Sequence, residues 1–454
     1  MDDIAMPEEL ECDVAIVGCG VAGLYAALNL PSDMRVVLLS KGAVDECDSM
    51  LAQGGICVLP CAEDYDSFFE DTMRAGHYEN RRESVDIMIR SSRSVINDLV
   101  ALGVEFDRDR DGGLAFTREG AHARPRIAFH KDVTGRAITS TLLDRVRELP
   151  NVRLLEYTAM VDLLVEDGAC SGVLARPVTP AQSELAIDEL DGSAAESDRL
   201  APAYPVRAAS TILATGGIGG VYQHSTNFPQ LTGDACYLAN KHGLELENLD
   251  YVQIHPTGLY SELAGRTFLI SESCRGEGAV LLNQAGERFT DELQPRDVVA
   301  RAISEQMRAD GAEFEWLSFA SVERDVVRDH FVNIRGRCLE EGRDILEEPI
   351  PVVPTQHYFM GGVRVDRDSA TSMDGLYAAG ETSCNGVHGK NRLASNSLLE
   401  ALVFARRAAY RIATGESMPV RKIAGATVYA GTVVEEGVHR PCGVAGAAID
   451  ALCP

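Results

Sequence analysis

Polar side chains gather in several short segments of the sequence, and their types suit the binding of carboxylates. The segment QIHPTG carries Gln253, His255 and Thr257 at alternate positions, so these side chains lie on one side of an extended chain. The segment HGKNR carries Arg392. Because Arg binds carboxylates with two parallel hydrogen bonds, segments of this kind could build a pocket with two cationic clamps.

Other segments share this polar character, but each also has a plain structural explanation. A single His in such a segment is more often a structural residue than a catalyst. Arg118, Arg124 and Arg126 could form a solvated charged face, and we favour that interpretation for most of them. Metal binding is not expected, because no two His have ligand spacing and no Cys accompanies them. These segments are TREGAHARPR (117–126), SESCRGEGA (271–279), QPRDVVARAI (294–303) and QHYFMGG (356–362).

The Arg392 loop runs directly into a predicted helix. Ser and Asn residues in the loop are good N-caps, and a helix N-terminus is a natural seat for an anion. The loop is therefore either an ordinary capped helix start or a place where a negative group binds. The helix is predicted by apolar residues at helical spacing, namely Leu398, Leu399, Leu402, Val403 and Ala405.

A glycine motif follows the first predicted strand. The sequence GCGVAG supplies Gly18, Gly20 and Gly23 at the spacing GxGxxG, between a buried strand and a helix. The first Gly permits a tight turn, the second lets a pyrophosphate approach the backbone, and the third lets helix and strand pack. The usual acidic residue after the second strand is missing. Ser40 and Lys41 stand there, so a ribose would need a hydroxyl or an ammonium group.

Three further glycine-bearing turns follow or flank predicted strands, at 52–55, 214–217 and 378–381. Each could be an ordinary turn, but one nucleotide site does not need so many. A long cofactor with two ends, such as FAD, does need them, because its flavin ring lies far from its adenine. The set therefore favours FAD.

These motifs sit on alternating strands and helices. The segments 14–17 and 36–39 are buried strands of a βαβ unit of the parallel-sheet type. A mixed segment at 249–354 separates the glycine motif from the strand and turn at 374–383, so a different domain is inserted between two dinucleotide-type pieces. Helices are predicted at 84–102, 135–149 and 297–309, and strands at 152–176 and from 209 into the glycines that follow.

The composition is that of a globular protein of two or three domains, with 454 residues, 45% hydrophobic residues and a net charge of −27. This charge disfavours nucleic acid and anionic membranes as partners. No apolar run is long enough for a transmembrane helix, and the acidic N-terminus does not read as a signal peptide. Twelve scattered Cys indicate reduced thiols and a cytoplasmic location. The acidic segment 179–205 is predicted to be a solvated loop without chemistry.

Over residues 10–412 the sequence resembles the L-aspartate oxidase family, within the flavoprotein superfamily that includes succinate dehydrogenase and fumarate reductase. The resemblance implies an α/β fold in which a Rossmann-like FAD-binding domain (1–248 and 355–415) holds an inserted α+β capping domain (249–354). Members usually carry a further C-terminal helical domain, which looks truncated here to a tail at 416–454. The motifs that carry the resemblance are LLSKG with AQGGI, TREGAH, QIHPT, RGEGA, PRDVVARAI, HYFMGGV and HGKNRLASNSLLEAL.

The resemblance implies that L-aspartate loses a hydride to FAD and becomes iminoaspartate, and that O2 or fumarate reoxidises the flavin. The product would feed quinolinate synthase in NAD biosynthesis. Arg296 would be the proton-transfer residue, although Arg is a poor base and its role could be chiefly electrostatic. Glu119 would face the substrate ammonium. The carboxylates would be held by His255, His357 and Arg392, with Gln253 and Ser271 nearby.

The family also implies a set of cofactor-binding residues. Asp48 stands where respiratory relatives attach FAD covalently through a His, so the flavin is expected to be noncovalent. Two alternatives stay open: a fumarate reductase or succinate dehydrogenase type of flavoprotein, and a non-catalytic flavin-binding protein. The implied FAD contacts are Gly18, Cys19, Gly20, Val21, Ala22, Gly23, Ser40, Lys41, Asp48, Ser49, Met50, Leu51, Ala52, Gln53, Gly54, Gly55, Asp234, Glu381, Ser397 and Leu398.

Overall fold

The computed structural model describes residues 9–190, 200–263, 265–427, 429 and 433–434. Its largest sheet contains β1 (Leu10–Val17), β2 (Val36–Leu39), β6 (Val152–Leu155), β7 (Thr158–Glu166), β8 (Ala169–Pro177), β9 (Tyr204–Leu213) and β16 (Leu376–Ala378). The order is β6-β2-β1-β9-β8-β7, and β16 pairs with the end of β9. Strands β6, β2, β1, β9 and β16 are parallel, whereas β7 and β8 add an antiparallel edge.

The first strand, α1 (Val21–Asn29) and β2 form the predicted βαβ unit, with Val14 paired to Val36. Strand β16 joins this sheet from a distant part of the sequence, which brings the AAGE turn beside the glycine motif. The predicted α/β fold is confirmed.

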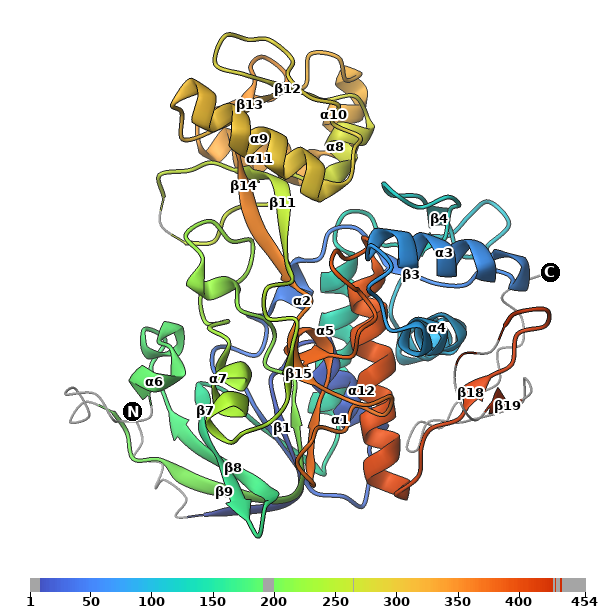
Figure 1. The fold of residues 1–454 in the computed structure, drawn as a ribbon, viewed down its shortest axis with the longest axis vertical. Coiled ribbons are helices and arrows are strands. Elements are labelled where there is room, and N and C mark those ends of the chain that lie inside the picture. The colour runs from blue at the N-terminus through green and yellow to red at the C-terminus, as the bar shows by residue number, and fades with distance from the viewer. Residues whose placement is uncertain (1–8, 191–199, 264, 428, 430–432, 435–454) are drawn as a thin grey trace.

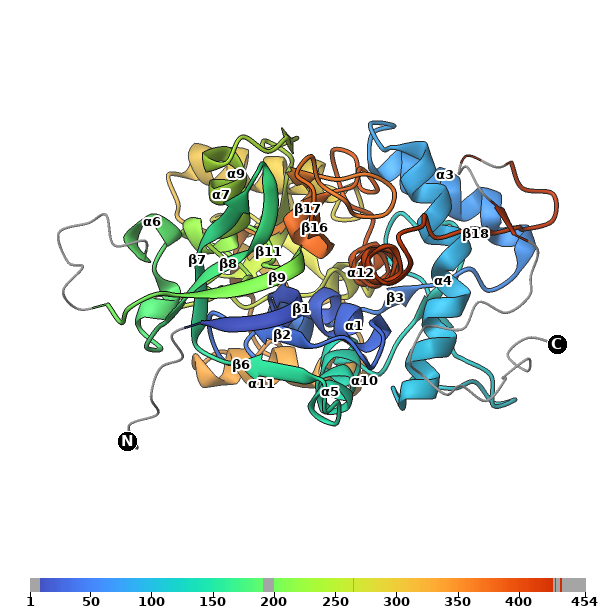
Figure 2. The ribbon, with the colours of Figure 1, turned by 90° about the horizontal axis from the view of Figure 1, so that it is seen from below.

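Helices cover the parallel part of the sheet. Helix α12 lies against α1 and α4, and Figure 2 shows it end-on between them. Most residues of α12 are buried. Its buried Arg406 and Arg407 form ion pairs with Asp98 and Asp368, respectively. The helices of this region are α3 (Tyr65–Ala75), α4 (Arg82–Leu102), α5 (Thr134–Arg147) and α12 (Asn396–Thr414). Of these, α5 and α12 contact the parallel strands, whereas α4 packs on α12 and α3 packs on α4.

A second group of elements forms the cap at the top of Figure 1. Its antiparallel sheet has the order β11-β14-β13-β12, and its buried apolar side chains form a cluster of their own. Strands β11 and β14 rise from the body into the cap (Figure 1), so the predicted domain boundary at 354/355 falls within β14. The cap contains β11 (Val252–Leu259), β12 (Val280–Leu282), β13 (Glu315–Ser318), β14 (Ile350–Phe359), α8 (Glu272–Gly276), α9 (Arg296–Asp310), α10 (Arg324–His330) and α11 (Val332–Glu340).

Short elements complete the described chain: α2 (Asp48–Leu51), β3 (Ile56–Cys57), η1 (Ala62–Asp64), β4 (Phe116–Thr117), β5 (Ile127–Ala128), η2 (Gln182–Glu184), α6 (Ile187–Leu190), η4 (Gly219–Val221), α7 (Asp234–Lys241), β10 (Leu246–Glu247), β15 (Gly362–Arg364), η5 (Gly380–Thr382), β17 (Ser383–Cys384), β18 (Val420–Arg421) and β19 (Val433–Val434). Across the described residues, no helix is both long and apolar enough to cross a membrane.

The acidic segment 179–205 is not simply the solvated loop that the sequence suggests. Its helix α6 buries Ile187 and Leu190, and Leu190 packs with Ala159 and Val161 of β7. The acidic composition of the segment outweighed these two apolar residues in the prediction from the sequence. Residues 191–199 of the segment, and most of the predicted tail after 427, lie outside the described residues.

Candidate active site

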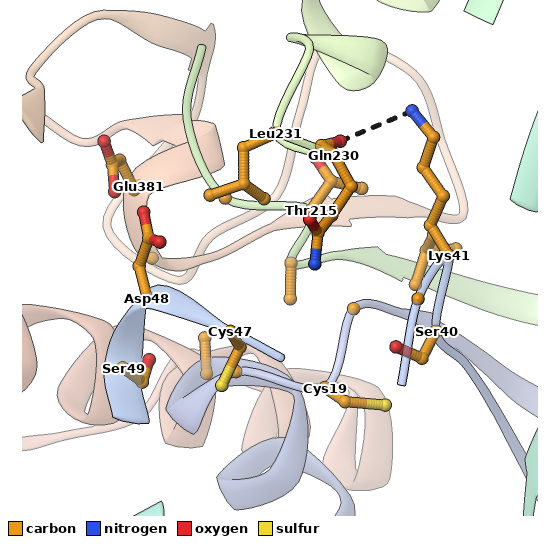
Figure 3. Close-up of a pocket in the computed structure, with 18 of the residues that line it drawn as sticks. Cys19, Ser40, Lys41, Cys47, Asp48, Ser49, Thr215, Gln230, Leu231 and Glu381 are labelled. Carbon is orange, nitrogen blue, oxygen red and sulfur yellow. Dashed lines mark hydrogen bonds between the residues drawn. The ribbon is translucent and has the colours of Figure 1, made fainter. Parts of the chain in front are cut away.

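An open cleft runs along the carboxyl ends of β1, β2 and β9, where α/β sheets bind nucleotides. Its empty space, the mouth included, is about 920 Å³, which suits a large ligand. Three of the four glycine-bearing turns contribute to its walls, and the turn at 52–55 does not. The predicted cofactor residues that line it are Gly18, Cys19, Gly20, Val21, Ala22, Ser40, Lys41, Asp48, Ser49, Asp234 and Glu381 (Figure 3 draws several of them).

The three glycines of the motif have different surroundings. Gly18 has φ +116°, and a Cβ there would overlap the carbonyl of Ala214. A Cβ on Gly23 would overlap the carbonyl of Gly18, so Gly23 serves the packing of α1 on the turn. At Gly20 the nearest atom to a Cβ would be Ser49 Oγ at 3.3 Å. Gly20 therefore leaves room at the N-terminus of α1, where backbone N–H groups favour an anion.

Lys41 lies at the far end of the cleft from Asp48 (Figure 3). Its ammonium donates to Asp234 Oδ2 and to Thr232 Oγ1, both at 2.9 Å, and to the Gln230 carbonyl at 3.3 Å. Ser40 is buried beside it. The hydroxyl and ammonium groups expected in place of an acidic residue thus both line the cleft.

Two carboxyl groups, Asp48 and Glu381, point toward one another at the other end of the cleft (Figure 3). Asp48 Oδ1 accepts from Phe228 N at 3.0 Å, while Oδ2 is buried without a partner. Burial raises the pKa of Asp48 to about 7. Burial and the charge of Asp48 raise the pKa of Glu381 to about 8. An unpaired buried oxygen in this position fits a cofactor hydroxyl group.

Beside this cleft, Gln253 joins two arginines that come from different parts of the fold. Its Oε1 accepts from Arg296 Nη1 at 3.2 Å and from Arg392 Nη2 at 3.2 Å. Its amide nitrogen donates to the Arg392 carbonyl at 2.9 Å and to Asn391 Oδ1 at 2.7 Å. Arg392 also donates to Ser397 Oγ at 2.7 Å. The two cations are therefore held close together, one from the cap and one from the body.

Two histidines lie near these arginines. The rings of His255 and His357 are edge to face, with centroids 5.4 Å apart. Burial, and then the nearby arginine charges, lower the pKa of both imidazoles well below the usual value. Both are neutral at pH 7. His357 Nδ1 bonds to Thr226 Oγ1 at 2.8 Å, so its other ring nitrogen is available to a ligand.

A third acidic group, Glu119, completes the cluster. Its Oε2 accepts from Ser395 Oγ at 2.7 Å, and a Cβ on Gly54 would overlap its Oε1. Burial raises the pKa of Glu119, whereas the Ser395 hydrogen bond and the charge of Arg296 lower it. A cationic ligand group beside it would favour the ionised form.

Ser395 does not cap α12 in the way that the capping hypothesis predicts. It occupies the N-cap of α12 with φ +62°, but its side chain makes no cap hydrogen bond to the helix. The hydroxyl instead bonds to Glu119 and accepts from Gly55 N at 3.3 Å. The loop is therefore built for the neighbouring site rather than for the helix alone.

Several predicted residues lie elsewhere. Ser271 caps α8 and accepts from Ser273 Oγ at 2.8 Å, so its hydroxyl already has a structural use. Arg118 and Arg124 are exposed, as favoured for most of these arginines, whereas Arg126 is the exception and is fully buried in ion pairs with Asp64 and Asp71. The predicted residues outside the cleft lining are Gly23, Met50, Leu51, Ala52, Gln53, Gly54, Gly55, Ser397 and Leu398.

The structure also adds residues that the sequence did not single out. Glu272 accepts from Arg296 Nε at 2.6 Å, and Arg275 Nη2 lies 3.9 Å from the same carboxylate. The ring of Tyr358 lies 4.7 Å beneath the Arg392 guanidinium. These residues stand in the polar segments SESCRGEGA and QHYFMGG, but nothing in the sequence was a reason to choose them individually. In the cleft, the added polar residues are Glu46, Cys47, Thr158, Thr215 and Gln230.

Comparisons with known proteins agree with this arrangement. The family described as "FAD binding domain" matches residues 13–398. The L-aspartate oxidase of Clostridium perfringens is 48% identical over 88% of this chain and 86% of its own length. That of Neisseria meningitidis serogroup B is 41% identical over 90% of this chain and 79% of its own length.

Among solved structures, a quinol-fumarate reductase with menaquinol molecules superimposes with a TM-score of 0.80 at 30% identity. The match covers 91% of this chain and 73% of that one. Mycobacterium smegmatis Sdh1 in complex with UQ1 gives a TM-score of 0.74 at 32% identity, over 90% and 69% of the two chains. The resemblance and the FAD cofactor predicted from the sequence are confirmed, and this chain belongs to the L-aspartate oxidase family of FAD-binding flavoproteins.

Proposed function

We propose that this protein oxidises L-aspartate to iminoaspartate. The observation that carries the proposal is the cluster of Arg296, Arg392 and Glu119 beside the nucleotide cleft, since it offers cations for two carboxylates and an anion for one ammonium group. Bound FAD would accept the hydride that leaves Cα, and the amine nitrogen would lose a proton as the imine forms. The two electrons would then pass to O2 or to fumarate.

In this proposal the chain supplies orientation and charge. Arg392 would bind one carboxylate of the substrate, and the neutral His255 and His357 would donate hydrogen bonds to carboxylate oxygens. Burial, and then the charge of Arg296, lower the pKa of Arg392 to about 10, so it is still a cation at pH 7. With both carboxylates and the ammonium group held, only one pose aims the Cα–H bond at the flavin.

Arg296 would stabilise the charge that develops near Cα during the reaction. Because the guanidinium donates to Glu272 Oε2 at 2.6 Å and to Gln253 Oε1 at 3.2 Å, its position is fixed without help from the substrate. An Arg held this way is a poor base, so its contribution is electrostatic preorganisation.

The Arg296→Leu variant tests this role. We expect flavin reduction by L-aspartate to slow by about 100-fold or more, while FAD stays bound. The matched control is Arg301→Leu, since Arg301 is an exposed residue of the same helix α9. Full activity in Arg296→Leu would remove the assignment.

A fumarate reductase or succinate dehydrogenase activity is the second candidate. The paired arginines would also bind fumarate or succinate, and the solved relatives include a quinol-fumarate reductase. Glu119 separates the two proposals, because a dicarboxylate without an amine has no use for a buried carboxylate beside its binding site. A non-catalytic flavin protein would not need this complete set of paired charges.

The flavin is proposed to be noncovalent, since a carboxylate, Asp48, stands in the cleft where attachment would require a nucleophilic His. Mass spectrometry of the denatured protein checks this point: the polypeptide should have its unmodified mass. A mass increase equal to that of FAD would contradict it.

The physiological setting is proposed in the same way. A cytoplasmic location fits the ten free Cys among the described residues. The chemistry of the product, an unstable imine, fits a role in NAD biosynthesis with quinolinate synthase as the next enzyme. Quinolinate formation in a mixture of the two purified enzymes would support this link, and its absence would count against it.

A further inference from the structure

His122 lies between the two loops that carry the proposed substrate-binding groups, Glu119 and Arg392. It is buried, with 5% of its surface exposed, and it belongs to the segment TREGAH. One ring nitrogen, Nδ1, lies 3.1 Å from Arg126 Nη1. The other, Nε2, lies 3.0 Å from the carbonyl oxygen of Ala394.

Arg126 fixes the state of this imidazole. Its remaining four N–H groups are taken by Asp64, twice, by Asp71 Oδ2 at 2.7 Å and by Ser67 Oγ at 2.9 Å. Because a guanidinium can only donate, His122 Nδ1 must accept the fifth N–H. Nε2 therefore carries the proton and donates it to the Ala394 carbonyl. Burial, and the charge of Arg126, lower the pKa of His122 to about 4, so this neutral tautomer persists at pH 7.

Arg126 and its partners connect the His122 imidazole to η1 and α3 of the body. Asp64 ends η1, and Ser67 and Asp71 are on α3. Asp71 Oδ2 also accepts from Ala123 N at 2.7 Å, which holds the backbone next to His122. Arg126 therefore holds the imidazole on its Nδ1 side, and the ring cannot shift without breaking charge-assisted hydrogen bonds.

The segments 119–122 and 394–395 are joined at two neighbouring points. His122 Nε2 binds the Ala394 carbonyl, and Glu119 Oε2 binds Ser395 Oγ at 2.7 Å. Within the first segment, His122 N donates to the Glu119 carbonyl at 3.3 Å, which closes a turn. Ala394 is two residues from Arg392. The spacing between the proposed ammonium site and the proposed carboxylate site therefore depends on this pair of contacts.

We propose that His122 is a positioning residue for substrate specificity: it holds the Glu119 turn against the Arg392 loop and so sets the spacing that selects an amino-dicarboxylate over a plain dicarboxylate. This inference rests on the proposed role of Glu119. Oxidation of L-aspartate needs both sites in register, whereas reduction of fumarate needs only the carboxylate groups. Loss of His122 should impair the first reaction far more than the second.

The test compares two reactions of the FAD-loaded protein: anaerobic flavin reduction by L-aspartate, and reoxidation of the chemically reduced flavin by fumarate. In His122→Phe, which cannot bind Ala394 or Arg126, we expect kcat/KM for L-aspartate to fall by about 10-fold to 100-fold. The fumarate reaction should change by less than about threefold. His122→Gln, whose amide can donate to Ala394 and accept from Arg126, should recover most of the loss.

The control is Arg124→Ala, in the same segment, because Arg124 is half exposed and lies 3.7 Å from Asp64. It should leave both reactions unchanged. If His122→Phe does not retain FAD, His122→Asn takes its place, since the shorter side chain cannot reach both partners. Equal losses in the two reactions would show a purely structural role and overturn the inference, as would no loss at all.

Glu119→Gln separates this inference from the proposed function. If that variant loses L-aspartate oxidation selectively while His122→Phe does not, the role of Glu119 stands and the role of His122 is refuted. If Glu119→Gln affects both reactions equally, the proposed ammonium site fails and the inference about His122 falls with it.

Discussion

Asp48 is a single residue whose titration should be visible in the stability of the flavin-free protein. An unfolded Asp releases its proton near pH 4, but burial raises the pKa of Asp48 to about 7. Between these values the folded protein holds a proton that the unfolded chain has lost. Its stability therefore falls as pH rises through this window and levels off above it.

The Asp48→Asn variant should remove this dependence. We expect its Tm to exceed that of the unmodified protein by roughly 2 °C or more at pH 8, and the difference to shrink toward pH 5. Thermal unfolding at a series of pH values measures it. A Tm difference that does not vary with pH would mean that Asp48 is ionised throughout.

The sequence identified most residues of the candidate site but not their pairings. Gln253, Arg296 and Arg392 stand in polar segments, and the resemblance implied a role for each; the structure brings the three together. Glu272 was missed because its importance comes from Arg296, 24 residues further along the chain. For the same reason the sequence could not separate Arg126 from its exposed neighbours, since partners 62 and 55 residues away allow it to be buried.

At the scale of elements, two glycines of the turn between β1 and α1 are expected to serve different purposes, one for cofactor binding and one for folding. Gly20→Ala adds a methyl group that meets Ser49 Oγ at 3.3 Å, beside the N-terminus of α1. We expect the protein to fold with FAD affinity lowered by about tenfold or more, because the backbone can no longer approach the pyrophosphate.

Gly18→Ala is the contrasting variant. Its methyl group would overlap the Ala214 carbonyl, and the backbone there has φ +116°. It should lower the Tm of the flavin-free protein as well as FAD affinity. The comparison uses FAD titration and thermal unfolding, and equal behaviour of the two variants would contradict the assigned roles.

The start of α12 gives a second prediction at this scale. Ser395 has φ +62°, a conformation that Gly adopts at lower cost, and its hydroxyl bonds to Glu119. Ser395→Gly should therefore keep or slightly raise the Tm while lowering kcat/KM for L-aspartate by about tenfold. A lowered Tm with unchanged activity would show that Ser395 serves the helix and not the site.

The helices and strands themselves were predictable where their pattern is strong. The predicted helix at 84–102 is α4, and the predicted helix at 297–309 is α9. The conformation of Ser395 could not be predicted, because contacts with Gly55 and Glu119, distant in sequence, impose it. Helix α6 was not predicted, for a different reason. Its two buried apolar residues are too few to show the helical period of hydrophobic residues.

The whole molecule carries a net charge of −27, yet its proposed ligands are anions. The structure resolves this conflict locally. Arg392 comes from the body and Arg296 from α9 of the cap, and Gln253 on β11 joins them. An inserted domain could be anticipated from the split pattern of motifs, whereas the contacts between cap and body required the structure.

The most direct test of the account follows the visible absorbance of bound flavin when L-aspartate is added to the purified holoprotein without oxygen. We expect L-aspartate to bleach the flavin rapidly, and succinate and D-aspartate not to do so, because only L-aspartate presents two carboxylates, an ammonium group and the Cα–H bond in one productive pose. Bleaching by succinate alone would contradict the account. So would reoxidation of the reduced flavin by fumarate if L-aspartate had no effect.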